Sequence, residues 1–172
     1  MLFRSKLESE LLDAAMNDAA VLARLQELGL ELAPVPVPVA AYVPVVLATP
    51  LAFVAGQVPM ADGRVMHPGH LGVDVSIEDG AAASARAALQ ALSALRDALG
   101  SFDRLRRIVQ VTVFVASAPD FVEHPKVANG ASERLIEVFG DEGKHARAAV
   151  GMSSLPLGAC VEVQLIAEIA PA

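Results

Sequence analysis

The sequence is short of cysteine, aromatic residues and basic residues, and each shortage excludes a class of protein. A single cysteine, Cys160, cannot form a disulfide within the chain, and we expect it to act as a small, partly buried hydrophobe. With no tryptophan, one tyrosine and six phenylalanines, few rings are present to stack on single-stranded bases. Thirteen basic against twenty acidic residues give a net charge of −7, so no net basic surface is present for phosphates. We therefore expect no nucleic-acid partner.

Long hydrophobic runs are also missing. Every apolar run ends well short of the roughly 20 residues that a membrane span needs, and charges at Arg4, Lys6, Glu8 and Glu10 leave no room for the apolar core of a secretory signal. We therefore expect a soluble, cytoplasmic protein without a membrane partner. The hydrophobic fraction is nevertheless 54% and the mean hydropathy +0.49, which predicts that part of the apolar surface is buried between subunits.

The first 38 residues differ from the rest of the chain. Apolar residues at helical spacing predict a helix over 5–32, interrupted at Met16-Asn17-Asp18 and stopped at Gly29. Prolines alternate with valines over 34–38, which predicts an extended connector and excludes a helix. We predict an N-terminal helical extension and linker over 1–38, and one folded domain over 39–172.

The folded domain alternates between strand and helix signals. Strands are predicted over 42–47 and 51–55, turned through Thr49-Pro50, and Asp62-Gly63 marks a further hairpin. A helix begins after Ser76, with Asp79 completing a capping box, and ends at Gly100. A strand follows over 104–116, with Val109, Val111, Val113 and Val115 on one face, and then a helical region over 117–140 that breaks near His124-Pro125.

Two strands complete the domain. The last alternates strictly, with Val161, Val163, Leu165, Ala167 and Ile169 on one face. The order of elements predicts an α+β fold, in which two main helices pack on one face of a mixed sheet. The less regular second face of strand 104–116 is typical of a sheet surface that meets another subunit.

Two possible ligand motifs are rejected. His67 and His70 have a spacing that suits a metal, but their loop supplies no cysteine or acidic partner pattern. The segment Gly140 to His145 lacks the spacing and the Ser/Thr of a phosphate loop. We therefore predict no metal site and no nucleotide site.

Two opposite charges each lie in an otherwise apolar C-terminal strand: Arg147 and Glu162. They could form an ordinary surface salt bridge of little energetic value. Alternatively, the guanidinium binds a small carboxylate through its fork of donors, and the carboxylate moves protons for a reacting water. Burial would raise the pKa of Glu162 and a nearby Arg147 would lower it.

The residues around this pair resemble the RidA (YjgF) family, often labelled endoribonuclease L-PSP. Arg147 is followed by Leu155-Pro156 and a Val-Glu-Val strand. Tyr42 precedes Ala55-Gly56-Gln57-Val58-Pro59, which is similar to the family's tyrosine and its Ser-Gly-Gln-x-Pro segment. Val111–Val115 with Asp120-Phe121 matches a family strand and turn, and Asn129 stands where the family has an asparagine opening a helix. The resemblance covers about residues 39–170.

This resemblance implies a trimer of chorismate-mutase-like domains that hydrolyses small reactive enamine and imine acids to 2-keto acids and ammonia. It implies clefts between subunits with Arg147 and Glu162 as the catalytic pair and Tyr42, Gly56 and Asn129 as substrate-binding residues, without a cofactor. The residues themselves leave alternatives open. Tyr42 could be a packed aromatic, Gly56 a plain turn or bulge, and Asn129 a helix start.

The sequence departs from the family pattern at four positions, which here are Ala55, Ala149, Gly151 and Gln164. Loss of side chains near Arg147 would enlarge or depolarise the pocket, so the substrate could differ. Two hypotheses follow: an imine deaminase, and a non-catalytic trimeric module that binds or senses small carboxylates such as imino or keto acids. A ribonuclease is a distant third.

Overall fold

The computed structural model describes residues 16–33, 35 and 41–171. Its centre is a five-stranded sheet in the order β1-β2-β7-β5-β6. The strands are β1 (Val45–Ala48), β2 (Leu51–Gln57), β5 (Leu105–Ala116), β6 (Ala146–Met152) and β7 (Val161–Ile169). Only β5 and β6 pair in parallel, and the other three pairings are antiparallel. The predicted mixed sheet is confirmed, and β6, the strand of Arg147, lies at one edge.

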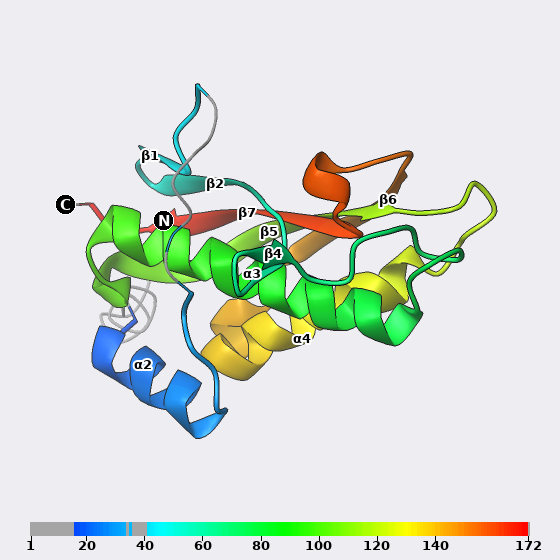
Figure 1. Cartoon of the computed structure of the whole chain (residues 1–172). Helices are drawn as coiled ribbons and strands as arrows, with labels where there is room; N and C mark the ends of the chain where they lie inside the picture. The colour runs from blue at the N-terminus through cyan, green and yellow to red at the C-terminus, as the bar shows by residue number, and fades with distance from the viewer. Residues whose placement is uncertain (1–15, 34, 36–40, 172) are drawn as a thin grey trace, which may run out of the picture.

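Two long helices cover one face of the sheet, as predicted (Figure 1). They are α3 (Ile77–Leu99) and α4 (His124–Phe139). Small residues let them approach closely, since a Cβ at Gly130 of α4 would lie 1.9 Å from the carbonyl oxygen of Ala81 in α3. Ser76 caps α3 by accepting from the Asp79 N–H, and Gly100 ends it in a left-handed conformation. Both predicted ends of this helix are confirmed.

The N-terminal helix is shorter than predicted. α2 spans Asp18–Glu27, and Asn17 is its N-cap because its side chain accepts from the Ala20 N–H. The predicted stop at Gly29 is confirmed, since the chain leaves the helical conformation at Leu28 and Gly29 follows with φ +67°, but residues 30–32 are not helical. The predicted helix before residue 16 and the three prolines of the connector lie outside the described residues. The boundary at 38/39 stays a prediction.

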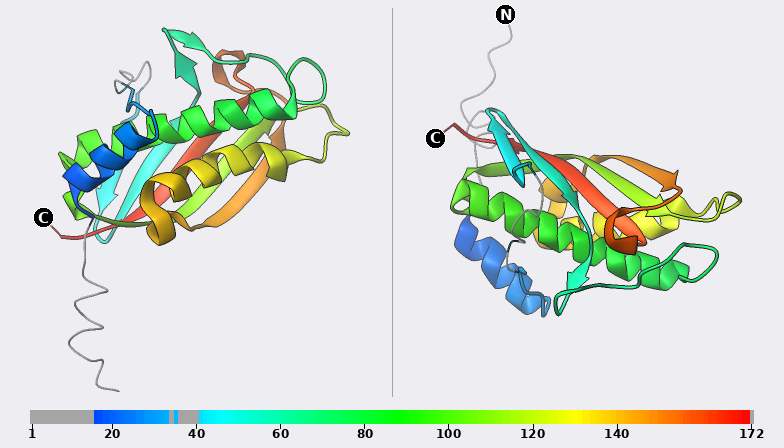
Figure 2. Two further views of the ribbon diagram at one scale, coloured as in Figure 1. Left: turned by 90° about the horizontal axis from the view of Figure 1, so that it is seen from below. Right: turned by 45° about the horizontal axis from the view of Figure 1, so that its top comes forward.

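α2 lies on the side of the helices away from the sheet (Figure 2). Its Val21 and Leu25 join the hydrophobic core. Asp18 fixes it to the end of α3 through two hydrogen bonds from Arg96, at 2.9 and 2.8 Å, and one from the Phe102 N–H at 2.8 Å. Arg96 accordingly holds the pKa of Asp18 below its usual value, chiefly through the side-chain hydrogen bond.

Strand β5 differs from its predicted pattern at one end. Val111, Val113 and Val115 are fully buried, as predicted, but Val109 is only half-buried and Ile108 takes its place in the core. The register with β7 shifts between Ile108 and Gln110, because a β-bulge adds a residue and reverses the alternation beyond it.

The remaining elements are short. The hairpin of β3 (Met60–Ala61) and β4 (Arg64–Val65) turns at Asp62-Gly63 as predicted, and β1 turns into β2 at Thr49-Pro50. Three 3-10 turns occur: η1 (Phe102–Arg104), η2 (Gly140–Gly143) and η3 (Pro156–Gly158).

Two further predictions need correction. The helical region over 117–140 is helical only from His124, because Pro125 suits the first turn of a helix rather than its interior. Asn129 therefore lies inside α4 and does not open it. Cys160, which the strand pattern of the C-terminal segment also predicts to lie in the last strand, precedes β7 instead. Its expected burial is confirmed and raises the pKa of its thiol to about 11.

The second face of the sheet carries no helix in the part of the chain that the structure describes (Figures 1 and 2). Val46 and Phe53 lie opposite each other on this face and are 51% and 40% exposed. Val150 adds a third exposed apolar side chain at the far edge. Among the described residues, none of the helices has the length and apolar character to cross a membrane.

Candidate ligand-binding site

Arg147 lies on the edge strand β6 and is held by helix α4. Its Nη1 donates to Oδ1 of Asn129 at 2.9 Å and to Oγ of Ser132 at 3.0 Å, and its Nη2 donates to the carbonyl oxygen of Pro125 at 3.4 Å. The side chain is exposed in the single chain. No acceptor contacts Nε among the described residues, so Nε and the second hydrogen of Nη2 retain donors for a ligand.

His145 contacts Ser132, one of the residues that hold Arg147. His145 Nε2 lies 3.0 Å from Ser132 Oγ, and its Nδ1 lies 2.6 Å from the carbonyl oxygen of Gly143. Burial is the main reason that the pKa of His145 is lowered, and the charge of Arg147 lowers it further. A neutral imidazole here orients Ser132 without repelling the guanidinium.

Glu162 lies on β7, against Gly56 of β2. A Cβ at Gly56 would stand 1.6 Å from Oε1 of Glu162, so glycine is required for the carboxyl group to occupy this place. Gly56 falls where the register between β2 and β7 shifts, between Val54 and Gln57. The alternative of a bulge is therefore confirmed at this residue, and its role in binding substrate stays a prediction. Burial raises the pKa of Glu162 above its ordinary value.

Tyr42 belongs to the same end of β2. The Ala55 N–H donates to the carbonyl oxygen of Pro44 at 2.9 Å, so the chain just after Tyr42 runs alongside the residue before Gly56. The tyrosine side chain is 50% exposed, which excludes the alternative that it is a packed core aromatic within one chain.

The two charged residues do not meet within one chain. Arg147 pairs with Val111, whose side chain is buried on the helical face, whereas Glu162 pairs with Phe114, which points to the opposite face. The sheet therefore separates two groups of predicted site residues: Arg147 with Asn129, and Glu162 with Gly56 and Tyr42. The separation also explains why burial decides the pKa of Glu162 in the single chain.

Sequence reasoning missed two residues of this site, Ser132 and His145. Ser132 could have been found, because it follows Asn129 by three residues and so shares its helical face. His145 carried no usable signal, since its role depends on how η2 brings it against α4. In the described ranges, no group of three or more His, Cys, Asp or Glu side chains could hold a metal ion.

The fold is that of a small α+β domain, with Arg147 on an edge strand of its sheet. The model of the YjgF/chorismate-mutase-like endoribonuclease family matches residues 22–169. Protein TCP17 of Trypanosoma cruzi is 43% identical over 150 residues, which are 87% of this chain and 94% of that protein. The chain belongs to the YjgF/chorismate-mutase-like family.

Solved structures agree with this assignment. Atu1372 of Agrobacterium tumefaciens, described as a protein of unknown function, is 41% identical with a TM-score of 0.82, covering 90% of this chain and 96% of that one. TdcF of E. coli, solved with bound serine, is 18% identical with a TM-score of 0.55, covering 81% and 94%. The second likeness concerns the fold alone.

Proposed function

We propose that this protein hydrolyses small reactive enamine and imine acids to 2-keto acids and ammonia. The observation that carries the proposal is the guanidinium of Arg147, which Asn129 and Ser132 hold at one nitrogen while its other edge stays open. Such an edge matches a carboxylate in two parallel hydrogen bonds. A small amino acid, serine, is also what the TdcF structure holds.

Glu162 is the proposed acid and base. The oxygen of a water adds to the imine carbon while the carboxylate of Glu162 accepts a proton from that water and passes it to the imine nitrogen, which gives a carbinolamine. Glu162 then accepts the hydroxyl proton and delivers it to the amino group, so that the carbon–nitrogen bond breaks, ammonia leaves and a carbonyl forms. A carboxyl whose pKa is raised by burial is suited to both proton transfers.

The complete site is proposed to form between subunits of a trimer. Arg147 and Glu162 face opposite sides of the sheet, so Arg147 of one chain can meet Glu162 only of another. The exposed apolar face around Val46 and Phe53 supplies a surface for such an assembly. Tyr42 and Gly56 would then line the Glu162 side of the cleft, and Asn129 the Arg147 side.

The first test couples amino-acid oxidases to a semicarbazide trap and measures the loss of imine for a panel of amino acids. We expect the wild type to speed this loss and Arg147→Ala to abolish the acceleration, whereas Arg24→Ala, which removes a charge on α2, should retain it. If no imine is consumed faster while isothermal titration shows keto acids binding through Arg147, the protein is a binding module and not an enzyme.

The second test concerns the shared site. Arg147→Ala and Glu162→Gln should each be inactive as pure proteins. After the two are unfolded together and refolded, mixed assemblies contain some clefts with both wild-type residues, so part of the activity should return. No recovery from mixed trimers would contradict a site built by two chains.

A further inference from the structure

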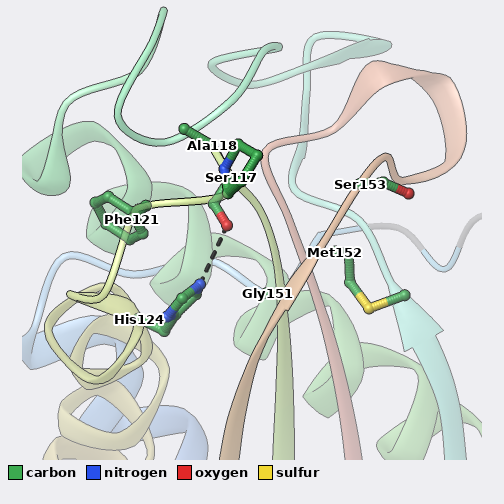
Figure 3. Close-up of a pocket in the computed structure, with 8 residues that line it drawn as sticks. Ser117, Ala118, Phe121, His124, Gly151, Met152 and Ser153 are labelled. Atoms are coloured by element: carbon green, nitrogen blue, oxygen red, sulfur yellow. Dashed lines mark hydrogen bonds between the residues drawn. The ribbon is translucent and has the colours of Figure 1, made fainter.

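A pocket of about 280 Å³ opens where the end of β5, the start of α4 and the end of β6 meet. Figure 3 shows the hydroxyl of Ser117 and the imidazole of His124 pointing toward one another across it, beside Gly151. Ser117 Oγ and His124 Nε2 are 3.1 Å apart, and the ring of Phe121 packs edge-on against the imidazole with centroids 5.1 Å apart.

Gly151 keeps this pocket open. A Cβ at this position would lie 2.6 Å from Nε2 of His124 and 3.1 Å from Oγ of Ser117. Any other residue would therefore press on the polar atoms of the pair. Both side chains are half-buried, and no acidic residue lines the pocket. When the Nε2–H of His124 donates to Oγ of Ser117, the hydroxyl hydrogen of Ser117 can be donated to an incoming oxygen atom.

The pocket and Arg147 lie along the same face of strand β6. Gly151 and Arg147 lie four residues apart on the same face of β6, which corresponds to roughly 13 Å along a strand. His124 is followed directly by Pro125, whose carbonyl accepts from the Arg147 guanidinium at 3.4 Å. Consecutive residues at the start of α4 therefore touch the anchor on one side and the pocket on the other.

We propose that this pocket receives the distal carboxylate of the same small acid whose first carboxylate is bound by Arg147. The hydroxyl of Ser117, which His124 orients, donates a hydrogen bond to the distal group, and Gly151 supplies the space. The inference rests on the proposed function in one respect, the ligand held by Arg147. The pocket is expected to select dicarboxylic imino and keto acids over acids with an alkyl side chain of equal length.

The test is isothermal titration of the full chain with 2-oxoglutarate and with 2-oxopentanoate, which have the same chain length. We expect 2-oxoglutarate to bind at least about tenfold tighter, as one or more added charge-assisted hydrogen bonds predict. His124→Gln and Gly151→Ala should remove this preference and leave the affinity for 2-oxopentanoate unchanged. Ser153→Ala, in the same pocket, is the matched control and should retain the preference.

Equal binding of the two acids by the wild type, or no binding of either, would overturn the inference. An equal loss of affinity for both acids in His124→Gln and Gly151→Ala would also overturn the inference, because it would indicate that these residues have only a structural role. The two proposals can fail separately. If the protein prefers 2-oxoglutarate but hydrolyses no imine, the pocket proposal stands and the proposed enzyme activity fails. If it hydrolyses imines but shows no preference, the enzyme activity stands and the pocket proposal fails.

Discussion

At the scale of single residues, the site depends on small side chains placed beside charged ones. Gly56 leaves the space that the Glu162 carboxyl fills, and Gly151 leaves the space between strand β6 and His124. Neither glycine has a positive φ, so close approach rather than backbone conformation is the reason that each is needed. A methyl group at either position is therefore a sensitive probe of function that the backbone can tolerate.

Gly56→Ala should inactivate the protein while leaving it folded. The added Cβ takes the place of Oε1 of Glu162, and the flexible carboxyl can move away, so the free energy of unfolding should change by less than about 1 kcal/mol. Imine hydrolysis should fall by about 10² or more, which is the usual contribution of a general acid or base. Urea unfolding and the semicarbazide assay measure the two effects. A fully active Gly56→Ala protein would show that the position of Glu162 does not matter.

The pH dependence of imine hydrolysis should report the environment of Glu162. Burial raises the pKa of this carboxyl above the ordinary value of 4.5. The base form is needed for water activation, so kcat/KM should rise with pH along a limb whose midpoint lies above 4.5. Glu162→Gln should remove both the limb and most of the rate. A midpoint below the ordinary value would instead indicate that the partner's Arg147 outweighs burial in the assembled cleft.

At the scale of elements, helix α4 positions the groups that we propose to bind the ligand. Its first turns present His124, Pro125, Asn129 and Ser132 along β6, and Val127, Ala131 and Leu135 fix its other side in the core. The 3-10 turn η2 brings His145 against the same helix. α2 is attached by a separate set of polar contacts around Asp18.

Asp18→Asn should destabilise the protein at neutral pH. It removes the charge that binds Arg96 through two hydrogen bonds, and such charge-assisted bonds are each worth about 2 kcal/mol when shielded. The folded-state pKa of Asp18 is lowered, so its stabilising effect is complete above the ordinary value near 3.8 and disappears as the pH falls through the folded-state pKa. Urea unfolding at pH 7 and at low pH measures this difference.

A matched control is Asp141→Asn. This carboxylate is fully exposed and pairs with Lys144 at 2.6 Å, a contact that lowers its pKa but shields nothing from water. Its removal should leave the free energy of unfolding unchanged. A loss of stability equal to that of Asp18→Asn would contradict the special role of the α2 contact.

At the scale of the whole molecule, the protein has one covered and one uncovered sheet face. Arg147 and its helix lie on the covered side, and Glu162 lies on the uncovered side. The exposed apolar side chains of the uncovered face fit the high hydropathy of the sequence. Assembly through this face would bury them and bring the two groups of site residues together.

Phe53→Asp should dissociate the proposed trimer. The side chain is 40% exposed in the single chain and sits between Val46 and Ile166 in register, so a carboxylate there would be buried without a partner upon assembly. Light scattering during size-exclusion chromatography should give a smaller mass, with loss of activity. Val122→Asp is the control, because Val122 is 75% exposed before α4 and away from the sheet. An unchanged mass for Phe53→Asp would locate the interface elsewhere.

The sequence by itself determined the elements and their order. The alternation in β7, the caps of α3 and the break at His124-Pro125 are local signals, because they follow from the periods of strand and helix and from the chemistry of single turns. The same patterns carried the resemblance that picked out Arg147 and Glu162. Local signals failed at Val109 and at Asn129, because a β-bulge and an uncertain helix start shift the pattern by a few residues.

Only the tertiary structure decided which residues meet. Arg147 and Glu162 point to opposite faces because of the strand order β7-β5-β6 and the register of each pair. Neither the order nor the register can be predicted from the sequence of a single strand. The contacts of Ser132 with Arg147 and with His145, and of His124 with Ser117, join residues from separate elements. A sequence specifies such contacts only through the packing of the whole core, because side chains distant along the chain are brought within hydrogen-bond range by the fold.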